Sequence, residues 1–370
     1  MALEFIQQEL ESLKRSGLYR ELKTIEKVDG SKITISGKEY LLFCSNNYLG
    51  LAQHPKVIEK SIEIIKEFGV GAGASRLISG NTIIHEELEA RIAKFKNREA
   101  ALVFPTGYMA NLGAITSLVD ENDTVIIDRL NHASIIDACR LSKAKLQVYP
   151  HKDMKALEKI FKKSDKFKKR LIVTDHVFSM DGDIALLAEI VELAKEHDSM
   201  TMVDEAHAVG LDSNKDIDIV MGTLSKAFGS LGGYIAGSRE LIDYLRNKAR
   251  SFIYTTGLPP AACAAALAAL DIIESQPELI RNLRMNSRFL RDKLSIPGGE
   301  DTPIIPIIIG DTDRTMAISQ KLFERGIFAS GIRPPTVPKG SARLRITVTA
   351  NHSKEDLNCL ASSLQELIQK

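Results

Sequence analysis

A lysine surrounded by small residues is a candidate nucleophile. Lys226 lies in the segment GTLSKAFG (residues 222–229), directly after a predicted apolar strand. Its glycine and serine neighbours would let a ligand approach the backbone closely. An amine held away from water at a strand end has a lowered pKa and can attack a carbonyl carbon. A solvated surface lysine is the alternative for this residue taken alone.

A carboxylate and a histidine follow a second predicted strand. Asp204 ends the apolar run TMV, and His207 comes shortly after it. Ligand crevices form at the carboxyl ends of parallel strands, and a carboxylate there needs a positive partner. That partner is a protonated pyridine nitrogen, a metal ion or an arginine. The lack of an obvious third ligand disfavours a metal site, and the lack of a GxxxxGK(S/T) loop disfavours a nucleotide.

Three further segments place polar groups just after predicted strands. A helix that starts near Gly107 and Tyr108 offers free backbone N–H groups, which is typical of a phosphate site. His132 is expected either to cap the next helix or to stack on an aromatic ligand. Ser179 lies in a turn whose DGD sequence lacks the spacing of a calcium-binding EF-hand. These five segments together supply the groups that hold pyridoxal phosphate.

The elements that position these groups follow an alternating pattern. Short β-branched runs alternate with amphipathic segments such as residues 184–197, which predicts an α/β fold with a wound, mostly parallel sheet covered on both faces. Runs such as LIVT and TVII are continuously apolar, as buried parallel strands are. The predicted strands are residues 101–104, 124–127, 145–149, 170–174, 200–203, 219–222 and 233–236.

The C-terminal part predicts a smaller α+β domain. A break at GLPP (residues 257–260) precedes one long helical stretch over 260–295. The strands expected after it are 303–310, 327–330 and 343–348, and the helices are 315–325 and 354–370. We therefore predict an N-terminal segment over 1–45, a large cofactor-binding domain over 46–260 and a smaller domain over 261–370.

Composition and charge exclude several classes of protein. Lys and Arg number 49 against 48 Asp and Glu, so the surplus of positive charge typical of nucleic-acid and membrane-surface proteins is missing. The basic run 152–170 is expected to be a solvated helix and loop. Four widely spaced cysteines predict neither a disulfide framework nor a zinc site. Without an apolar signal-peptide core at the start, and with its most apolar stretch (261–270) too short to span a bilayer, the chain is expected to be cytoplasmic.

An ordered set of motifs resembles the α-oxoamine synthases, a branch of the fold-type I pyridoxal-phosphate enzymes. Besides the segments above, the motifs are SNNYLGL (45–51), GAGASR (71–76), ISGN (78–81), RPPTVP (333–338) and ARLR (342–345). The resemblance covers nearly the whole chain. It implies the aspartate-aminotransferase-like fold, in which a large, mostly parallel sheet domain carries a smaller α+β C-terminal domain. It also implies an acyltransferase that uses pyridoxal 5'-phosphate and no metal.

The resemblance implies roles for individual residues around the cofactor. Lys226 would bind it covalently and move the substrate α-proton, Asp204 would pair with the pyridine nitrogen, and His207 with the ring hydroxyl. His132 would stack on the ring, and Ser179 would hydrogen-bond near it. The phosphate would be held by Gly107, Tyr108, Thr223 and, from the neighbouring subunit of a homodimer, Thr255.

The resemblance also implies a substrate site. Arg345 would grip the carboxylate of the amino acid, because its planar fork meets a carboxylate at two points. Residues matching positions near the acyl donor are Arg20, Asn46, Ser75, Arg333 and Thr336. One departure is a shortened loop between His207 and Lys226, which casts doubt on any role of that loop in substrate entry; His176 is interpreted as incidental.

The substrates implied are L-alanine and a pimeloyl thioester, either pimeloyl-CoA or a pimeloyl-carrier protein. Their decarboxylative condensation gives 8-amino-7-oxononanoate, a biotin precursor. The alternatives are a glycine C-acetyltransferase or another α-oxoamine synthase and, more remotely, a non-catalytic partner subunit. Neither a nucleic acid nor a membrane is expected as a partner.

Overall fold

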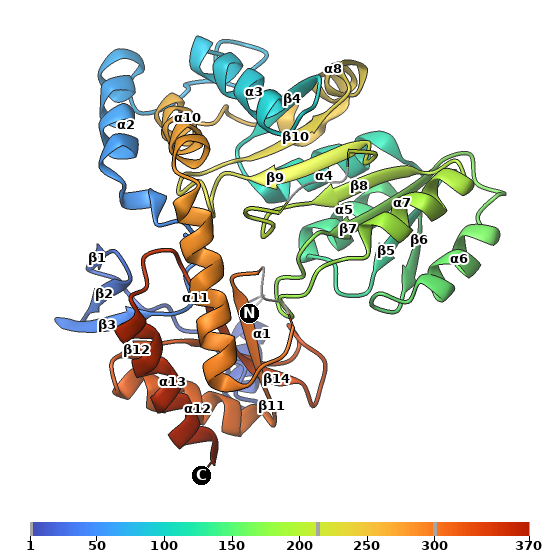
Figure 1. Ribbon diagram of the computed structural model, residues 1–370. Coiled ribbons are helices and arrows are strands. Elements are labelled where there is room, and N and C mark those ends of the chain that lie inside the picture. Colours follow the sequence, from blue (N-terminus) through green and yellow to red (C-terminus); the bar gives the residue numbers. More distant parts are fainter. Residues whose placement is uncertain (1–2, 212–214, 299–301, 370) are drawn as a thin grey trace.

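A seven-stranded sheet organises the larger part of the computed structural model, which describes residues 3–211, 215–298 and 302–369. The strand order is β4-β10-β9-β8-β7-β5-β6, and β10 runs antiparallel to both of its neighbours. The others pair in parallel, so the predicted mostly parallel sheet is confirmed (Figure 1). The strands are β4 (Ala100–Phe104), β5 (Thr124–Asp128), β6 (Lys145–Tyr149), β7 (Arg170–Asp175), β8 (Met200–Asp204), β9 (Ile219–Thr223) and β10 (Gly233–Gly237).

Helices cover both faces of this sheet, because its strands are apolar on both sides. On β5, Val125 and Ile127 join one buried cluster, whereas Ile126 joins the other. One face carries α4 (Gly107–Leu118), α5 (Ala133–Ser142), α8 (Arg239–Lys248) and α9 (Arg250–Ile253). The other carries α3 (Ile83–Phe95), α6 (Met154–Lys162), α7 (Leu187–Glu196) and α10 (Pro260–Ser275), and α2 (Pro55–Phe68) packs against α10.

The C-terminal part differs from the prediction at two points. The helical stretch expected over 260–295 is two helices, α10 and α11 (Glu278–Leu294), because Pro277 lacks the N–H that a continuous helix needs. The strand expected over 327–330 is two strands in different sheets, β12 (Ile327–Phe328) and β13 (Ser330–Ile332). The remaining elements are β11 (Ile304–Gly310), β14 (Ala342–Thr347), α12 (Thr312–Glu324) and α13 (Lys354–Gln369).

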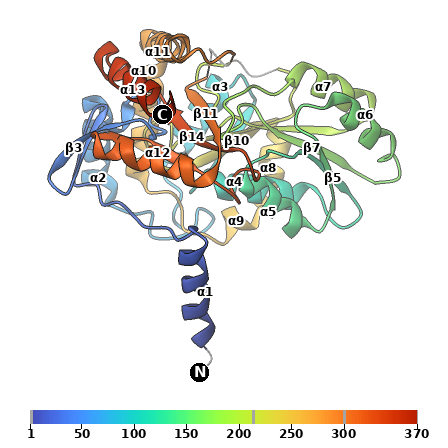
Figure 2. The same cartoon turned by 90° about the horizontal axis from the view of Figure 1, so that it is seen from below.

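The two ends of the chain share a sheet. The strands β1 (Lys27–Asp29), β2 (Lys32–Ile35) and β3 (Lys38–Leu42) form a four-stranded sheet with β12, which pairs parallel to β3. The short helix η1 (Leu51–Gln53) then leads to α2. The helix α1 (Glu4–Arg15) projects from the body with no buried residue (Figure 2). The division into segments 1–45, 46–260 and 261–370 stays a prediction.

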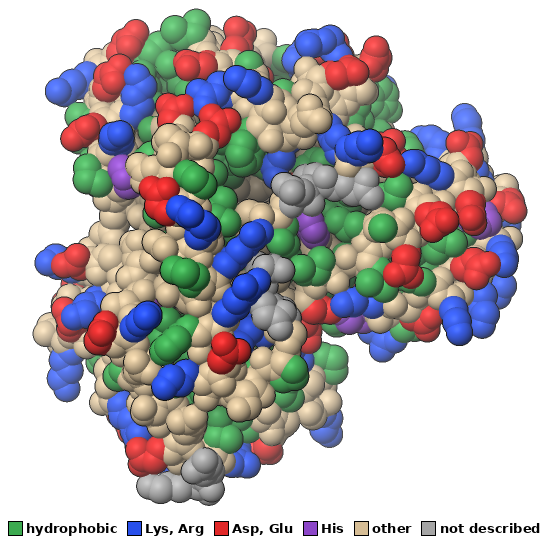
Figure 3. All heavy atoms as spheres, viewed as in Figure 1, with side chains coloured by type: hydrophobic (Ala, Val, Ile, Leu, Met, Phe, Trp, Pro, Cys, Tyr) green, Lys and Arg blue, Asp and Glu red, His purple; other side chains and the backbone are tan. Residues whose placement is uncertain are grey.

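The surface fits the balanced composition. Positive and negative side chains are interspersed on the face shown in Figure 3. Within the described ranges, no helix combines the length and the apolar character needed to cross a bilayer.

Candidate active site

A cavity of about 180 Å³ lies at the carboxyl ends of strands β7, β8 and β9, beside the first turn of α4. Its walls bring together residues that are far apart in the sequence. Of the residues predicted for the cofactor site, it is lined by Gly107, Tyr108, His132, Asp204, His207, Thr223 and Lys226.

Lys226 enters this cavity from the turn that follows β9. All five residues of that strand are buried, and a β-carbon on its Gly222 would come within 2.2 Å of the Tyr234 ring. Glycine is therefore needed where the strand passes Tyr234. Burial lowers the pKa of Lys226 and Arg345 lowers it further, although Asp204 opposes both. The amine is thus easier to deprotonate than a surface lysine.

Asp204 ends β8 and is held by hydrogen bonds on both carboxylate oxygens. The side-chain amide of Asn111 donates to Oδ2 at 2.8 Å, and the backbone N–H of Ala206 donates to Oδ1 at 2.9 Å. Only 4% of Asp204 is exposed. A buried carboxylate fixed in this way is ready to meet a cation inside the cavity.

Two histidines with lowered pKa values border the carboxylate. The Nδ1 of His207 lies 2.6 Å from the hydroxyl oxygen of Tyr48, and burial, Lys226 and Arg345 hold the pKa of His207 well below its ordinary value. His132 accepts the N–H of Ser134 at Nδ1 (3.2 Å) and so caps α5, while its ring also lines the cavity. Burial lowers the pKa of His132 as well. Both rings are therefore neutral at pH 7.

The first turn of α4 forms another wall. Thr106 caps this helix by accepting the N–H of Met109 at 3.2 Å, and the N–H groups of Gly107 and Tyr108 precede the first helical hydrogen bond. A β-carbon on Gly107 would lie 2.9 Å from Cε of Met221, so the backbone approaches β9 closely. The Thr223 hydroxyl lies 2.8 Å from that of Ser225. The Thr223 hydroxyl also donates to the backbone oxygen of Gly232 at 2.9 Å, so the free N–H groups of the helix start are the main donors of a suitable anion site.

Arg345 on β14 is buried and does not itself line this cavity, but it lies close enough for its charge to lower the pKa of Lys226. Its Nε donates to the backbone oxygen of Ser179 at 2.5 Å, and both Nη atoms lie 3.4 Å from Oδ1 of Asn46. No carboxylate within 3–211, 215–298 and 302–369 forms an ion pair with it. Only 7% of Arg345 is exposed, so a buried guanidinium is available for a carboxylate ligand.

Three other predicted residues line a separate groove of about 560 Å³. Arg20, Arg333 and Thr336 lie there with the end of α1. The Arg333 guanidinium donates to the backbone oxygen of Tyr19 at 3.3 Å and lies 3.2 Å from the sulfur of Met316. The N-terminal segment and the RPPTVP segment therefore meet at this groove.

Five predicted residues line neither of these cavities: Asn46, Ser179 and Arg345, of which Arg345 contacts the other two as described above, and Ser75 and Thr255.

Ser75 and Thr255 lie in neighbouring segments, because the N–H of Gly257 donates to the oxygen of Ala74 at 2.9 Å. Part of the shortened loop between His207 and Lys226, residues 212–214, lies outside the described residues.

The sequence prediction missed three residues at the site. Asp175 lines the cavity from β7, directly beside Asp204 in the sheet register, and burial together with Asp204 raises the pKa of Asp175 to about 8. Asp175 could have been identified from the sequence, because it is a second carboxylate at the end of a predicted strand. Asn111 stands in the quoted turn after β4, and Tyr48 in the motif SNNYLGL, but no sequence rule pairs them with Asp204 and His207.

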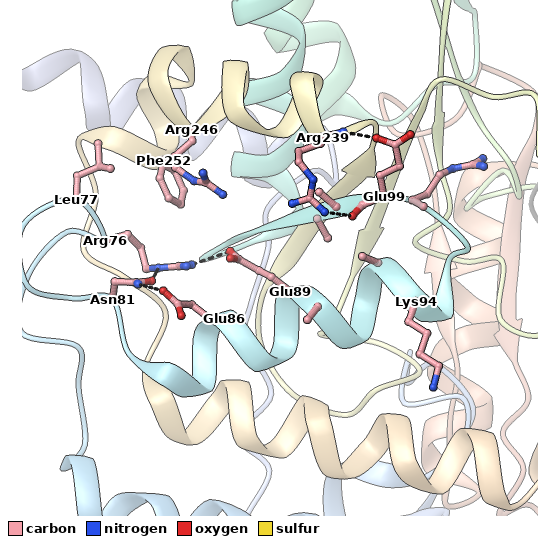
Figure 4. A pocket seen from close by; sticks show the side chains of 15 residues that line it. Arg76, Leu77, Asn81, Glu86, Glu89, Lys94, Glu99, Arg239, Arg246 and Phe252 are labelled. Carbon is pink, nitrogen blue, oxygen red and sulfur yellow. Dashed lines mark hydrogen bonds and ion pairs between the residues drawn. The ribbon is translucent and has the colours of Figure 1, made fainter.

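A larger cavity of about 720 Å³ lies away from this chemistry, along the edge of β4 (Figure 4). Several of its charged groups already have partners. Arg76 pairs with Glu89 at 3.0 Å, and Arg239 donates to the backbone oxygen of Glu99 at 3.1 Å. None of the predicted site residues lines it.

Comparisons with known proteins agree with the geometry. The family model of class I and II aminotransferases matches residues 38–364. The 8-amino-7-oxononanoate synthase of Thermoanaerobacter pseudethanolicus is 48% identical and covers 99% of this chain and 97% of its own. Serine palmitoyltransferase from S. paucimobilis, solved with a bound PLP–myriocin aldimine, has a TM-score of 0.92 at 30% identity, covering 100% of this chain and 98% of its own.

A solved 8-amino-7-oxononanoate synthase from Francisella tularensis has a TM-score of 0.76 at 28% identity, covering 89% of this chain and 97% of its own. The fold-type I transferase fold predicted from the sequence is confirmed by these structures. The chain belongs to the class I and II aminotransferase family and, within it, to the α-oxoamine synthases.

Proposed function

We propose that this chain is an acyltransferase that condenses L-alanine with a pimeloyl thioester. The products are 8-amino-7-oxononanoate, carbon dioxide and the free thiol, and the reaction belongs to biotin biosynthesis. The observation that carries the proposal is one buried cavity lined by Lys226 and Asp204, with Arg345, which has no carboxylate partner in the described residues, close enough to lower the pKa of Lys226. The similarity to an 8-amino-7-oxononanoate synthase, at 48% sequence identity, also supports the proposal.

The groups around the cavity fit pyridoxal phosphate. The orphaned side-chain oxygen of Asn111, buried without a partner in the described part of the chain, marks a place where a further donor is missing. Asp204 would pair with a pyridine nitrogen, His207 with the ring hydroxyl, and His132 with the ring face. Gly107, Tyr108 and Thr223 would hold the phosphate. When bound, this cofactor supplies an electron sink that makes the α-proton of an amino acid removable.

Lys226 performs the proton transfer. Its lowered pKa makes the amine easier to deprotonate than an ordinary lysine, which would let it anchor the cofactor and later accept the α-proton. Asp204 is fixed by the hydrogen bonds that both of its oxygens accept, and its carboxylate would pair with the pyridine nitrogen.

Arg345 orients the amino acid. Its Nε is fixed by the Ser179 carbonyl, so the two Nη atoms point to one place and receive the carboxylate at two points. Asn46 stands beside them. The acyl thioester would enter past Arg20, Arg333 and Thr336, and the positive charges of the two arginines suit the anionic parts of either a CoA or a carrier-protein thioester.

A homodimer belongs to the same proposal. Five apolar side chains of the N-terminal region are exposed along or beside α1, although such residues are normally covered. They are Leu3, Phe5, Ile6, Leu10 and Leu13. Thr255 and Ser75, which lie outside the cavity of their own chain, would then serve the site of the second copy. The cytoplasmic location expected from the sequence is also part of this proposal.

A direct assay tests the proposed reaction. Purified protein supplied with pyridoxal phosphate is given L-alanine or glycine against a panel of acyl thioesters of different length, on CoA and on a carrier protein. The expected result is 8-amino-7-oxononanoate from alanine and a pimeloyl thioester, with the highest kcat/KM in the panel. A preference for glycine with acetyl-CoA would assign the chain to the alternative reaction. No turnover with any pair would support a non-catalytic subunit.

A further inference from the structure

A half-buried histidine outside the active-site cavity bridges two carboxylates. His151 follows β6, and its Nδ1 lies 3.1 Å from each carboxylate oxygen of Asp128. Its Nε2 lies 2.9 Å from Oδ2 of Asp183. The ring packs edge-on against Phe178, with centroids 4.4 Å apart. A ring with an anionic acceptor at each nitrogen carries both protons, so this is an imidazolium between two anions.

Asp128, the first of these carboxylates, shapes the turn that precedes His132. Asp128 ends β5 and is 1% exposed as a side chain. Its Oδ1 accepts the N–H of Leu130 at 2.9 Å, and its backbone oxygen accepts the N–H of Asn131 at 3.1 Å. His132, which lines the cavity, follows directly. Asp128 therefore shapes the turn that leads to His132, together with Asp175, whose Oδ2 accepts the N–H of His132 at 3.0 Å.

The second carboxylate closes the loop over residues 178–183. The backbone oxygen of Asp183 accepts the N–H of Phe178 at 3.0 Å, so the ends of the loop are tied together. Inside the loop, the oxygen of Ser179 accepts Nε of Arg345, and Asp181 accepts Nη1 of Arg343 at 2.6 Å. The loop is therefore the support on which the guanidinium of Arg345 rests.

The charges around His151 favour its protonated form. Burial opposes this charge, but Asp128 on β5 and Asp183 in the loop outweigh it and raise the pKa of His151 to about 9. The other charged group in contact is Lys152, whose Nζ lies 3.1 Å from Asp183. Because the folded pKa lies above the ordinary 6.5, the bridge is complete below pH 6.5 and is lost as the pH rises through about 9.

We propose that His151 is a positioning residue that ties the turn carrying His132 to the loop supporting Arg345. It touches neither substrate nor cofactor, and it acts by fixing the spacing between the ring-stacking and the carboxylate-binding sides of the site. The inference rests on the proposed function for the roles of His132 and Arg345, but the contacts that it invokes exist without that function.

The test compares the holoenzyme with His151→Leu, which removes both bridges, and His151→Gln, which keeps one donor. Amide hydrogen exchange of residues 128–132 and 178–184 is expected to accelerate in the leucine variant and less in the glutamine variant. KM for L-alanine is expected to rise about tenfold in His151→Leu, while kcat stays within about twofold. In the parent protein, KM for alanine should rise above pH 9, and this rise should be absent from His151→Leu.

His197→Gln is the matched control, because His197 is a part-buried histidine that stacks on Phe161 in the outer helices. It should leave KM and the exchange of both segments unchanged. Unchanged exchange in His151→Leu, or an NMR titration of the His151 ring near pH 6.5 in the parent protein, would overturn the proposal. If the leucine variant unfolds, hydrogen exchange in the glutamine variant and the titration of the His151 ring still test whether His151 holds the two segments together. Absent turnover in the parent would count against the proposed function alone, since exchange and titration need no substrate.

Discussion

The cavity around Lys226 is closed by strand ends, whereas the groove around Arg333 is closed by loops and the projecting helix α1. The cavity is small, about 180 Å³, and the side chains of Asp204 and His207 are each fixed by a hydrogen bond from another element. The groove is about 560 Å³ and includes the exposed Arg20 and Thr336.

This difference separates two tasks of the proposed reaction. Activation of the amino acid depends on charges placed to within a few tenths of an ångström, and a buried sheet holds them most rigidly. Recognition of a long acyl chain needs area more than precision, and loops can provide it. We therefore expect substitutions in the cavity to abolish the chemistry, and substitutions in the groove to change only the affinity for the acyl donor.

The largest effect is expected from Lys226→Ala. Removing the amine removes both the anchor of the cofactor and the acceptor of the α-proton, so kcat/KM should fall by at least about 1,000-fold. Circular dichroism and thermal unfolding should stay close to those of the parent, because the Lys226 side chain forms no hydrogen bond or ion pair within the described part of the chain. Turnover of Lys226→Ala near the parent rate would contradict the claim that the chemistry takes place in the cavity.

A smaller effect is expected from Arg345→Ala. Its Nη atoms have no carboxylate partner in the described residues, so the main loss is that of substrate binding. KM for L-alanine should rise about 30-fold or more, the cost of removing one partner of a buried charge pair. Arg345→Lys keeps the charge but loses the planar fork, and it should recover only part of the affinity. Steady-state kinetics with varied alanine measures both, and full recovery by lysine would argue against two-point binding.

A still smaller effect is expected in the groove. Arg333→Ala removes a partly exposed charge, so KM for the acyl thioester should rise by only about two- to fivefold, with kcat unchanged. The effect should shrink at high salt, because exposed charges are screened. Arg246→Ala is the matched control, since Arg246 lines the separate cavity of Figure 4. A large fall in kcat in Arg333→Ala would place the groove in the chemistry.

The smallest effect concerns the stability of the cavity without cofactor. Burial and Asp204 raise the pKa of Asp175 to about 8, above the ordinary 3.8 of an aspartate. Its contribution to stability is therefore present at low pH and is lost as the pH rises through about 8. The melting temperature of the cofactor-free protein should fall by a few degrees from pH 6 to pH 9. In Asp175→Asn the fall should be smaller, and an equal fall in both proteins would contradict the assignment.

The strands and the groups at their ends could be predicted because they obey local rules. Buried parallel strands are continuous β-branched runs, and Asp204, His132 and Lys226 each follow such a run. Asp175 obeys the same rule, because β7 extends one residue beyond the predicted end at Thr174 and ends at this carboxylate. The break before α11 was readable in the same way from Pro277.

Contacts between distant segments could not be predicted. Tyr48 meets His207 across 159 residues of chain, and Arg345 meets the Ser179 carbonyl across 166. The same holds for the pairing of β12 with β3, which depends on how the two ends of the chain fold together. Such contacts arise from packing, and no periodicity in the sequence encodes them.

The central claim, that Lys226 is the residue that anchors pyridoxal phosphate, can be tested by mapping the attachment site. The holoenzyme is reduced with borohydride, digested and analysed by mass spectrometry. We expect a single pyridoxyl modification, on the peptide containing Lys226, and none on the Lys226→Ala protein. A modification on another lysine such as Lys96, which lies in a buried ion pair with Glu205, would contradict the account.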